Sequence, residues 1–194
     1  MSSWGADTFD RLYAASDDPW RFQTSPYEQA KYAASLATLP AGRFGRAFEA
    51  GCSIGVLTRA LAPRCDRLLA VDLSEAALRL ARARCKDQQW VRFGRMALPH
   101  DWPAGERFDL MVFSEVLYFL DAADLRLAAA RTAASLAADG CVLLVNWTGE
   151  TDTPTTGDAA ADLFITASGL AATAQARAPF YRLDVLRRRP GAGG

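Results

Sequence analysis

Apolar positions fall into short runs that are separated by longer amphipathic segments along most of the chain. Runs of four to seven apolar residues are typical of buried strands, whereas apolar residues spaced three and four apart are typical of helices. This pattern predicts strands at 47–50, 67–72, 90–93, 108–113 and 141–147, and helices at 56–62, 74–85, 121–138 and 158–168. Strands that alternate with helices predict a parallel sheet covered on both faces.

The last two strands break this alternation. An alternating stretch at 171–177 and an apolar stretch at 180–186 are joined by only a few residues around Pro179. A parallel connection needs about a dozen residues, so this pair should be an antiparallel hairpin. The predicted fold is a doubly wound, Rossmann-like α/β sheet with an antiparallel C-terminal strand, formed by residues 1–194 as a single domain.

Residues 1–40 precede the first strand, and we expect them to form an N-terminal helical cap on the core of residues 41–194. A short helix is expected at 7–15, followed by a turn at 17–22. A second helix should begin at Ser25 and Pro26, since serine caps helices and proline suits the first helical position. Such a cap would lie over the carboxyl ends of the strands, where ligands bind in this type of sheet.

The glycine turn at residues 47–55 is the strongest indication of a ligand. Gly51 and Gly55 follow the first strand directly, and the second strand ends on Asp72, a residue placed for the hydroxyls of a ribose. A dinucleotide site would need a third glycine and room for a pyrophosphate, but Glu49 stands where that anion would lie. A nucleoside that carries a positive charge and no phosphate therefore fits this turn better.

The E-x-G-x-x-x-G spacing resembles motif I of the class I methyltransferases, which bind S-adenosyl-L-methionine and release S-adenosyl-L-homocysteine. More closely, segments 17–21, 25–32, 48–58 and 108–120 are similar to the nodulation protein S family. That resemblance implies N-methylation of a glucosamine amine in a deacetylated chitooligosaccharide during Nod-factor synthesis. The family often has aspartate where this chain has Ala97, which removes one expected contact to the adenine amine.

Together with these placements, the resemblance implies a set of site residues. Cofactor contacts are expected from Trp20, Arg21, Lys31, Glu49, Gly51, Cys52, Gly55, Asp72, Leu73, Ala97, Leu98 and Ser114. Arg21 or Lys31 would pair with the cofactor carboxylate, unless both are simply solvated. Substrate contacts are expected from Tyr27, Tyr118 and Trp147, whose rings could stack on pyranose faces or belong to the core.

Methyl transfer mainly requires alignment and exclusion of water, so no catalytic pair is required. Glu115, after the fourth strand, could accept a proton from an amine or hold an ammonium, or it could be a solvated carboxylate. His100 lies in a loop without a visible acidic partner, which favours a surface or packing role. Cys52 lies in the glycine turn and is expected to line the cofactor site without acting as a nucleophile.

Composition narrows the classes of partner. The chain has 22 basic and 22 acidic residues, so no net charge favours nucleic acid or an anionic membrane. The arginine run at 187–189 is predicted to be a solvated tail. Four scattered cysteines argue against a zinc site or disulfides and for a reducing compartment, and no run has the ~18 apolar residues of a membrane helix. We therefore expect a cytoplasmic protein with a small-molecule or oligosaccharide substrate and no metal.

Three other interpretations remain open at this stage. The chain could be a methyltransferase that acts on a nitrogen or oxygen of another small molecule, or a relative that binds the cofactor without catalysis. A nicotinamide oxidoreductase is a further alternative, but it lacks the third glycine. The sequence leaves the acceptor, the oligomeric state and the pathway undetermined.

Overall fold

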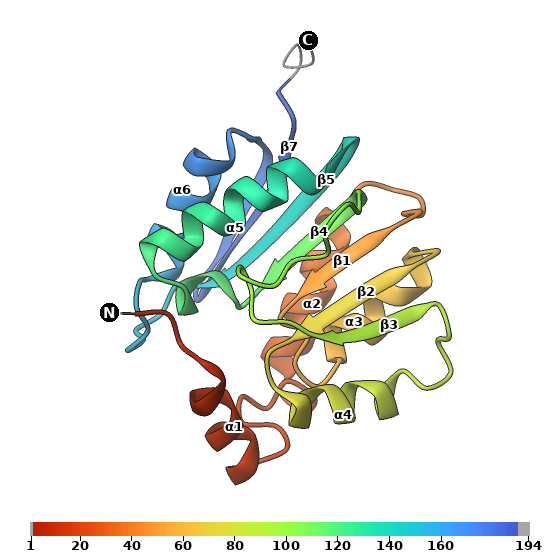
Figure 1. Cartoon of the computed structure of the whole chain (residues 1–194), viewed down its shortest axis with the longest axis vertical. Coiled ribbons are helices and arrows are strands. Elements are labelled where there is room, and N and C mark those ends of the chain that lie inside the picture. Colours follow the sequence, from red (N-terminus) through yellow and green to blue (C-terminus); the bar gives the residue numbers. More distant parts are fainter. Residues whose placement is uncertain (1, 190–194) are drawn as a thin grey trace.

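The computed structural model describes residues 2–189, which form a mixed seven-stranded sheet with helices on both faces (Figure 1). The strand order is β3-β2-β1-β4-β5-β7-β6. β1 to β5 run parallel to one another, and β7 is antiparallel to both β5 and β6. The strands are β1 (Ala47–Ala50), β2 (Leu68–Asp72), β3 (Val91–Arg95), β4 (Phe108–Ser114), β5 (Leu136–Trp147), β6 (Ala171–Ala178) and β7 (Tyr181–Arg187). The predicted doubly wound sheet with an antiparallel last strand is confirmed.

The helices begin where the sequence places capping residues. The side chains of Ser25, Ser74 and Asp121 each accept a backbone N–H in the first turn of the helix that follows, as predicted. The α-helices are α1 (Ala6–Ala15), α2 (Pro26–Thr38), α3 (Val56–Leu61), α4 (Glu75–Arg84), α5 (Ala122–Ser135) and α6 (Gly157–Ser168). Two short 3-10 helices, η1 (Ala62–Arg64) and η2 (Leu117–Phe119), complete the set among the described residues.

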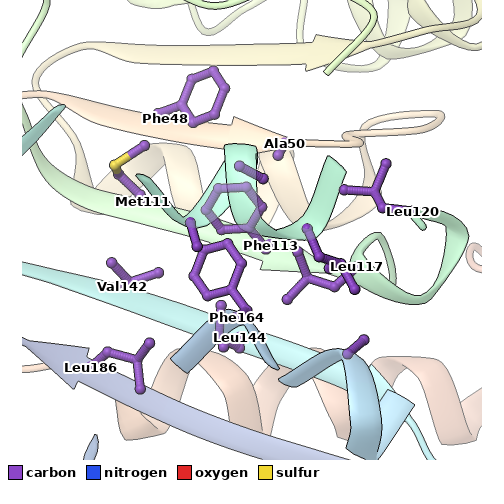
Figure 2. Close-up of a cluster of buried hydrophobic side chains, with 14 of the residues drawn as sticks. Phe48, Ala50, Met111, Phe113, Leu117, Leu120, Val142, Leu144, Phe164 and Leu186 are labelled. Atoms are coloured by element: carbon purple, nitrogen blue, oxygen red, sulfur yellow. The ribbon is translucent and has the colours of Figure 1, made fainter. Parts of the chain in front are cut away.

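Alternate side chains of each central strand enter the two halves of the core. On one face of the sheet, Phe48, Phe113 and Leu144 pack with Phe164 of α6 (Figure 2). On the other face, apolar residues of β1, β4 and β5 pack against α2 and α3. This burial of both faces explains why β4 and β5 are apolar almost throughout.

The connection from β3 to β4 contains no helix. Residues 96–107 cross the sheet as a loop, and Leu98 and Trp102 pack on the same core cluster as Phe48. The Trp102 indole N–H donates to the hydroxyl of Ser135 at 2.9 Å, which fixes the loop to the end of α5. The edge half of the sheet is therefore covered more thinly on this face than the half beneath α5 and α6.

Two sequence-based predictions are wrong near the end of α5. The helix stops at Ser135 and not at residue 138, because Leu136 leaves it to pair with Phe108 and to become fully buried as the first residue of β5. The predicted solvated tail is instead docked: Arg188 donates to the carbonyls of Ala133 and Leu136 at 2.7 Å each. Within residues 2–189, no helix is both long and apolar enough to cross a membrane.

Candidate functional site

The carboxyl ends of the central strands open into a cavity of about 710 Å³. The N-terminal segment closes its other side, so residues from the first 32 positions and from the strand ends share one wall. In Figure 1 α1 lies outside the two helical layers, beside the ends of the strands, whereas α2 packs against a face of the sheet. Of the residues predicted to bind ligands, those that line the cavity are Trp20, Tyr27, Lys31, Glu49, Gly51, Cys52, Asp72, Leu73, Leu98, Ser114, Glu115, Tyr118 and Trp147.

The glycine turn needs positive φ angles and close contacts that its two glycines, Gly51 and Gly55, allow. Gly51 has a φ of +66°, and a Cβ atom there would lie 2.3 Å from Cγ2 of Val116. Gly55 has a φ of +78°, and its Cβ would meet the backbone of Ala81 in α4 at 2.9 Å. Gly51 lines the cavity, and its lack of a Cβ atom leaves room for Val116. Gly55 lies outside the cavity lining and allows α3 and α4 to approach each other.

Asp72 holds the glycine turn in place while it lines the cavity. Its two carboxylate oxygens accept the backbone N–H groups of Ser53 at 2.8 Å and Ser74 at 2.9 Å. Burial raises the pKa of Asp72, and the N–H groups that it accepts partly offset this. Each oxygen keeps a lone pair for a further donor, such as a ligand hydroxyl.

Glu49 is a buried carboxyl group in the cofactor half of the cavity, the half that is lined by the glycine turn and Asp72. Its exposed fraction is 2%, and its Oε2 atom has no hydrogen-bond partner within the described residues. Burial raises the pKa of Glu49 to about 8. An unpartnered carboxyl oxygen on a cavity wall is costly unless a bound group satisfies it, and a cationic donor is the group that suits it best.

Glu115 is held at the end of β4 by three donors. One oxygen accepts the ammonium of Lys31 at 2.7 Å, and the other accepts the Tyr118 hydroxyl at 2.5 Å and the Trp147 backbone N–H at 3.0 Å. The backbone of Glu115 has a φ of 58°, a conformation that few residues other than glycine adopt. With this backbone conformation the carboxylate reaches Lys31 of α2, and the three hydrogen bonds hold the strained residue in place.

Lys31 lies between two carboxylates. Its ammonium is 2.7 Å from Glu115 Oε1 and 2.9 Å from Glu28 Oε2, and its side chain is only 1% exposed. The sequence predicts that Lys31 is either solvated or paired with the carboxylate of a ligand, whereas in the structure it pairs with two carboxylates of the protein. Because two protein carboxylates already share its single charge, it has little left for a ligand anion.

The cavity wall is strongly acidic. Among the described residues that line it, six carry carboxyl groups and one carries an ammonium. The acidic residues are Glu28, Glu49, Asp72, Glu115, Glu150 and Asp152, and the basic residue is Lys31. Such a wall attracts cationic ligands and repels phosphates.

Two aromatic residues of the cavity lining, Tyr27 and Trp147, pack with Phe180, which lies outside the lining. The rings of Trp147 and Phe180 stack with centroids 5.3 Å apart, and Tyr27 meets Trp147 edge to face at 6.0 Å. Phe180, at the tip of the β6–β7 hairpin, is still 51% exposed. Tyr118, by contrast, is buried with its hydroxyl bound to Glu115, which leaves its ring little surface for a sugar.

Three predicted cofactor residues are not in the cavity wall. Arg21 is exposed in the turn before α2, Gly55 packs against α4, and Ala97 lies in the loop after β3. His100 is also exposed, as expected of a surface residue. The expectation that it lacks an acidic partner is wrong, however, since its Nε2 lies 3.0 Å from Asp124 Oδ1 in α5.

The sequence-based reading missed Glu28, Glu150, Asp152 and Phe180. Glu28 is the third residue after the cap Ser25, a spacing that normally indicates a capping box. Its backbone N–H does bind the Ser25 hydroxyl, but its side chain binds Lys31 instead of returning to the cap. Within residues 2–189, no group of three His, Cys, Asp or Glu side chains is arranged to hold a metal ion.

Comparisons with known proteins agree with this arrangement. Nodulation protein S of Rhizobium tropici is 36% identical over 131 residues, which are 65% of this chain and 53% of that protein. The chain thus spans about half the length of the curated relatives it matches. A crystal structure from Pseudomonas syringae, of a protein proposed to be a methyltransferase, is 37% identical, with a TM-score of 0.74 over 84% of this chain and 99% of that one.

The fold itself is that of a solved N-methyltransferase. The crystal structure of NodS from Bradyrhizobium japonicum WM9 in complex with S-adenosyl-L-homocysteine has a TM-score of 0.82, covers 94% of this chain and 97% of that one, and is 24% identical. The family model of nodulation protein S (NodS) matches residues 6–149, well over half of the sequence. On this match, the chain belongs to the nodulation protein S family.

Proposed function

We propose that this chain, acting as a single domain, transfers a methyl group from S-adenosyl-L-methionine to the free amine of an amino sugar, in a short chitin-like oligosaccharide. The observation that carries the proposal is the acidic cavity beside the glycine turn, with six carboxyl groups and one ammonium in its wall. Both proposed ligands carry positive charge: S-adenosyl-L-methionine on its sulfonium and its ammonium, and the amino sugar on its protonated amine. The family membership and the relatives' names support the same assignment.

The residues of the cofactor half fit S-adenosyl-L-methionine. Glu49 presents an unpartnered carboxyl oxygen for the ammonium, and Asp72 presents lone pairs for the ribose hydroxyls. Gly51 lines the cavity and, because it has no Cβ atom, leaves room for Val116, which lines the same cavity. A dinucleotide fits less well, because its pyrophosphate would face the carboxyl group of Glu49.

When bound, S-adenosyl-L-methionine supplies a methyl group on a sulfonium with a good leaving group. The protein's part is to align the acceptor and to exclude water. Trp4, Phe9 and Trp20 of the N-terminal segment line the cavity and cover the ligand side of the strand ends. Glu150 and Asp152, in the loop after β5, give the entrance a negative charge that attracts an amine.

The acceptor is tested by a product assay. Formation of S-adenosyl-L-homocysteine should be rapid with chitooligosaccharides that carry one free amine and absent with their fully N-acetylated forms. The matched pair differs only in the amine, so it separates N-methylation from hydroxyl methylation. Turnover of hydroxyl or carboxylate acceptors with no turnover of any amino sugar would leave a methyltransferase with a different acceptor.

The cofactor assignment is tested at Asp72. Asp72→Ala removes the acceptor for the ribose hydroxyls, and hydrogen bonds to a charged group contribute about 1.5–3 kcal/mol. Calorimetry should therefore show affinity for S-adenosyl-L-homocysteine that is lower by about ten- to a hundredfold. Asp66→Ala, at an exposed carboxylate near the other end of β2, is the control and should bind normally. Equal affinity in the two variants would contradict the assignment.

A further inference from the structure

Glu28, Lys31 and Glu115 form a buried charge cluster with one negative charge in excess. The side chains of Glu28 and Glu115 are 11% and 10% exposed, and the ammonium of Lys31 lies within 3 Å of both carboxylates. Two carboxylates and one ammonium leave a net charge of −1 on the cavity wall. Because an uncompensated charge in a poorly solvated place is costly, the cluster is suited to one additional cation.

The two carboxylates differ in the number of hydrogen bonds that they accept. Both oxygens of Glu115 are occupied by donors from Lys31, Tyr118 and the backbone of residue 147. Glu28 receives a hydrogen bond only at Oε1, from Lys31 at 3.0 Å. Its Oε2 atom lies 2.9 Å from the same ammonium but accepts no hydrogen bond, although it is buried. The carboxylate oxygen of the cluster that accepts no hydrogen bond is therefore Oε2 of Glu28.

A second polar atom without a hydrogen bond belongs to another residue of the same cavity lining. The hydroxyl of Tyr27 is buried without a hydrogen-bond partner among the described residues, and its residue lines the same cavity. The ring of Tyr27 lies 5.5 Å from the Lys31 ammonium, at the charge cluster. Glu28 Oε2 and the Tyr27 hydroxyl oxygen accept no hydrogen bond among the described residues, so each can accept one N–H group of the same ammonium.

We propose that Glu28 binds the acceptor's ammonium group and takes the proton that must leave before the nitrogen can be methylated, an assignment that rests on the function proposed above. In this step an N–H bond breaks, an O–H bond forms on the Glu28 carboxylate, and the electron pair stays on nitrogen as the nucleophilic lone pair. Tyr27 accepts a second N–H and orients the amine. Lys31 and Glu115 are positioning residues that hold Glu28 in place, and Glu115 is not the base.

The surroundings of Glu28 suit proton transfer. Burial raises the pKa of Glu28, while Lys31 lowers it and Glu115 and Asp18 raise it further. The other titratable groups near it are the phenols of Tyr27, Tyr32 and Tyr118, whose own raised pKa values keep them protonated. A carboxylate with a raised pKa is a better match to an ammonium than an ordinary surface glutamate.

The experiment compares Glu28→Gln with Glu115→Gln. For Glu28→Gln we expect unchanged affinity for S-adenosyl-L-homocysteine, a kcat on deacetylated chitotriose about a hundredfold lower at pH 7, and recovery of much of this loss at pH 9, where the free amine is neutral in solution. Glu115→Gln should lower kcat without that recovery. Tyr27→Phe, which keeps the ring, should weaken acceptor binding about three- to tenfold.

A binding measurement separates this proposal from the proposed function. Calorimetry with deacetylated chitotriose, without cofactor, should show binding to the wild-type protein that Glu28→Gln weakens at least tenfold. If the wild-type protein binds this amine but turns over no amine, the proposed function fails and the ammonium site stands. If Glu28→Gln and Tyr27→Phe both bind and methylate like the wild type, Glu28 has no such role and the assignment is overturned.

Discussion

The cavity has two halves, named here after the ligands proposed for them: the cofactor half with Glu49 and Asp72, and the acceptor half with Glu28 and Glu115. The two halves hold their carboxylates in different ways. In the cofactor half, Asp72 is fixed by backbone N–H groups of the two adjoining turns, and Glu49 is fixed by burial within β1. In the acceptor half, Glu28 and Glu115 are fixed by a lysine from α2 and a tyrosine from η2. The first half is built by residues near one another in sequence, the second by side chains that are 84 positions apart.

This difference has an energetic consequence. Backbone N–H groups stay in place as long as the strands and turns persist, so the cofactor half depends on the fold as a whole. The acceptor half depends on a single ammonium, and removal of one member of a buried ion pair leaves an uncompensated charge. A single substitution should therefore destabilise the acceptor half more than the cofactor half.

The largest effect is expected for Lys31→Met. Without the ammonium, two buried carboxylates face each other, which costs about 3–5 kcal/mol of stability. Urea unfolding should show this loss near neutral pH, and the loss should shrink as the pH is lowered and Glu28 takes up a proton. Lys86→Met, at the other lysine of the chain, is exposed and serves as the control. If the two variants are equally stable, the contrast between the halves does not hold.

An intermediate effect is expected from the titration of Glu49. With a pKa of about 8 in the folded protein, Glu49 must lose a proton before it can bind an ammonium. Affinity for S-adenosyl-L-homocysteine should therefore rise about fivefold, or about 1 kcal/mol, from pH 7 to pH 8, because the ionised fraction of a group with this pKa rises from about a tenth to a half. In Glu49→Gln this rise should be absent. A wild-type affinity that is constant over this range would remove Glu49 from the cofactor half.

The titration of Glu49 also changes the stability of the protein without ligand, in a direction that its raised pKa determines. The folded protein holds a proton on Glu49 that the unfolded chain, with an ordinary pKa near 4.5, has released. Stability from this group is therefore greatest below about pH 4.5 and falls as the pH rises toward 8. Denaturation at several pH values, compared with Glu49→Gln, measures that slope.

The smallest effect is expected at the aromatic rim of the acceptor half. Phe180→Ala removes an exposed ring that stacks on Trp147, a residue of the cavity lining. An aromatic contact is worth about 0.5–1.5 kcal/mol, so KM for an amine-bearing oligosaccharide should rise roughly two- to tenfold without a change in cofactor affinity. Trp90→Ala, at the other large exposed aromatic among the described residues, should leave KM unchanged.

The sequence predicted the cofactor half better than the acceptor half for a physical reason. Strand ends and glycine turns are local features, so Glu49, Gly51 and Asp72 could be placed from hydrophobic periodicity and spacing alone. Contacts between α2 and the end of β4 depend on how the N-terminal segment folds over the sheet. Glu28 carried only a local signal, the capping spacing from Ser25, and that signal indicated a different role.

The end of α5 was missed for a similar reason. Alanine-rich residues up to 138 have high helix propensity, and the pattern continued the helix through them. The burial of Leu136 against β4 outweighs that propensity. Gly140 allows a close approach to β4, since a Cβ atom at this position would lie 3.0 Å from the carbonyl oxygen of Phe108. Tertiary packing, and not local preference, decides this boundary.

The contact between Gly51 and Val116 makes these two positions an epistatic pair. An alanine at position 51 would place its Cβ 2.3 Å from Cγ2 of Val116 but 3.6 Å from its Cβ, an ordinary contact. Val116→Ala therefore removes the clash and leaves only the cost of a positive φ, about 1–2 kcal/mol. In an evolving lineage, a smaller residue at 116 therefore makes a later change at 51 less costly. Because Val116 directly follows Glu115, divergence of the glycine turn is thereby linked to the acceptor half of the site.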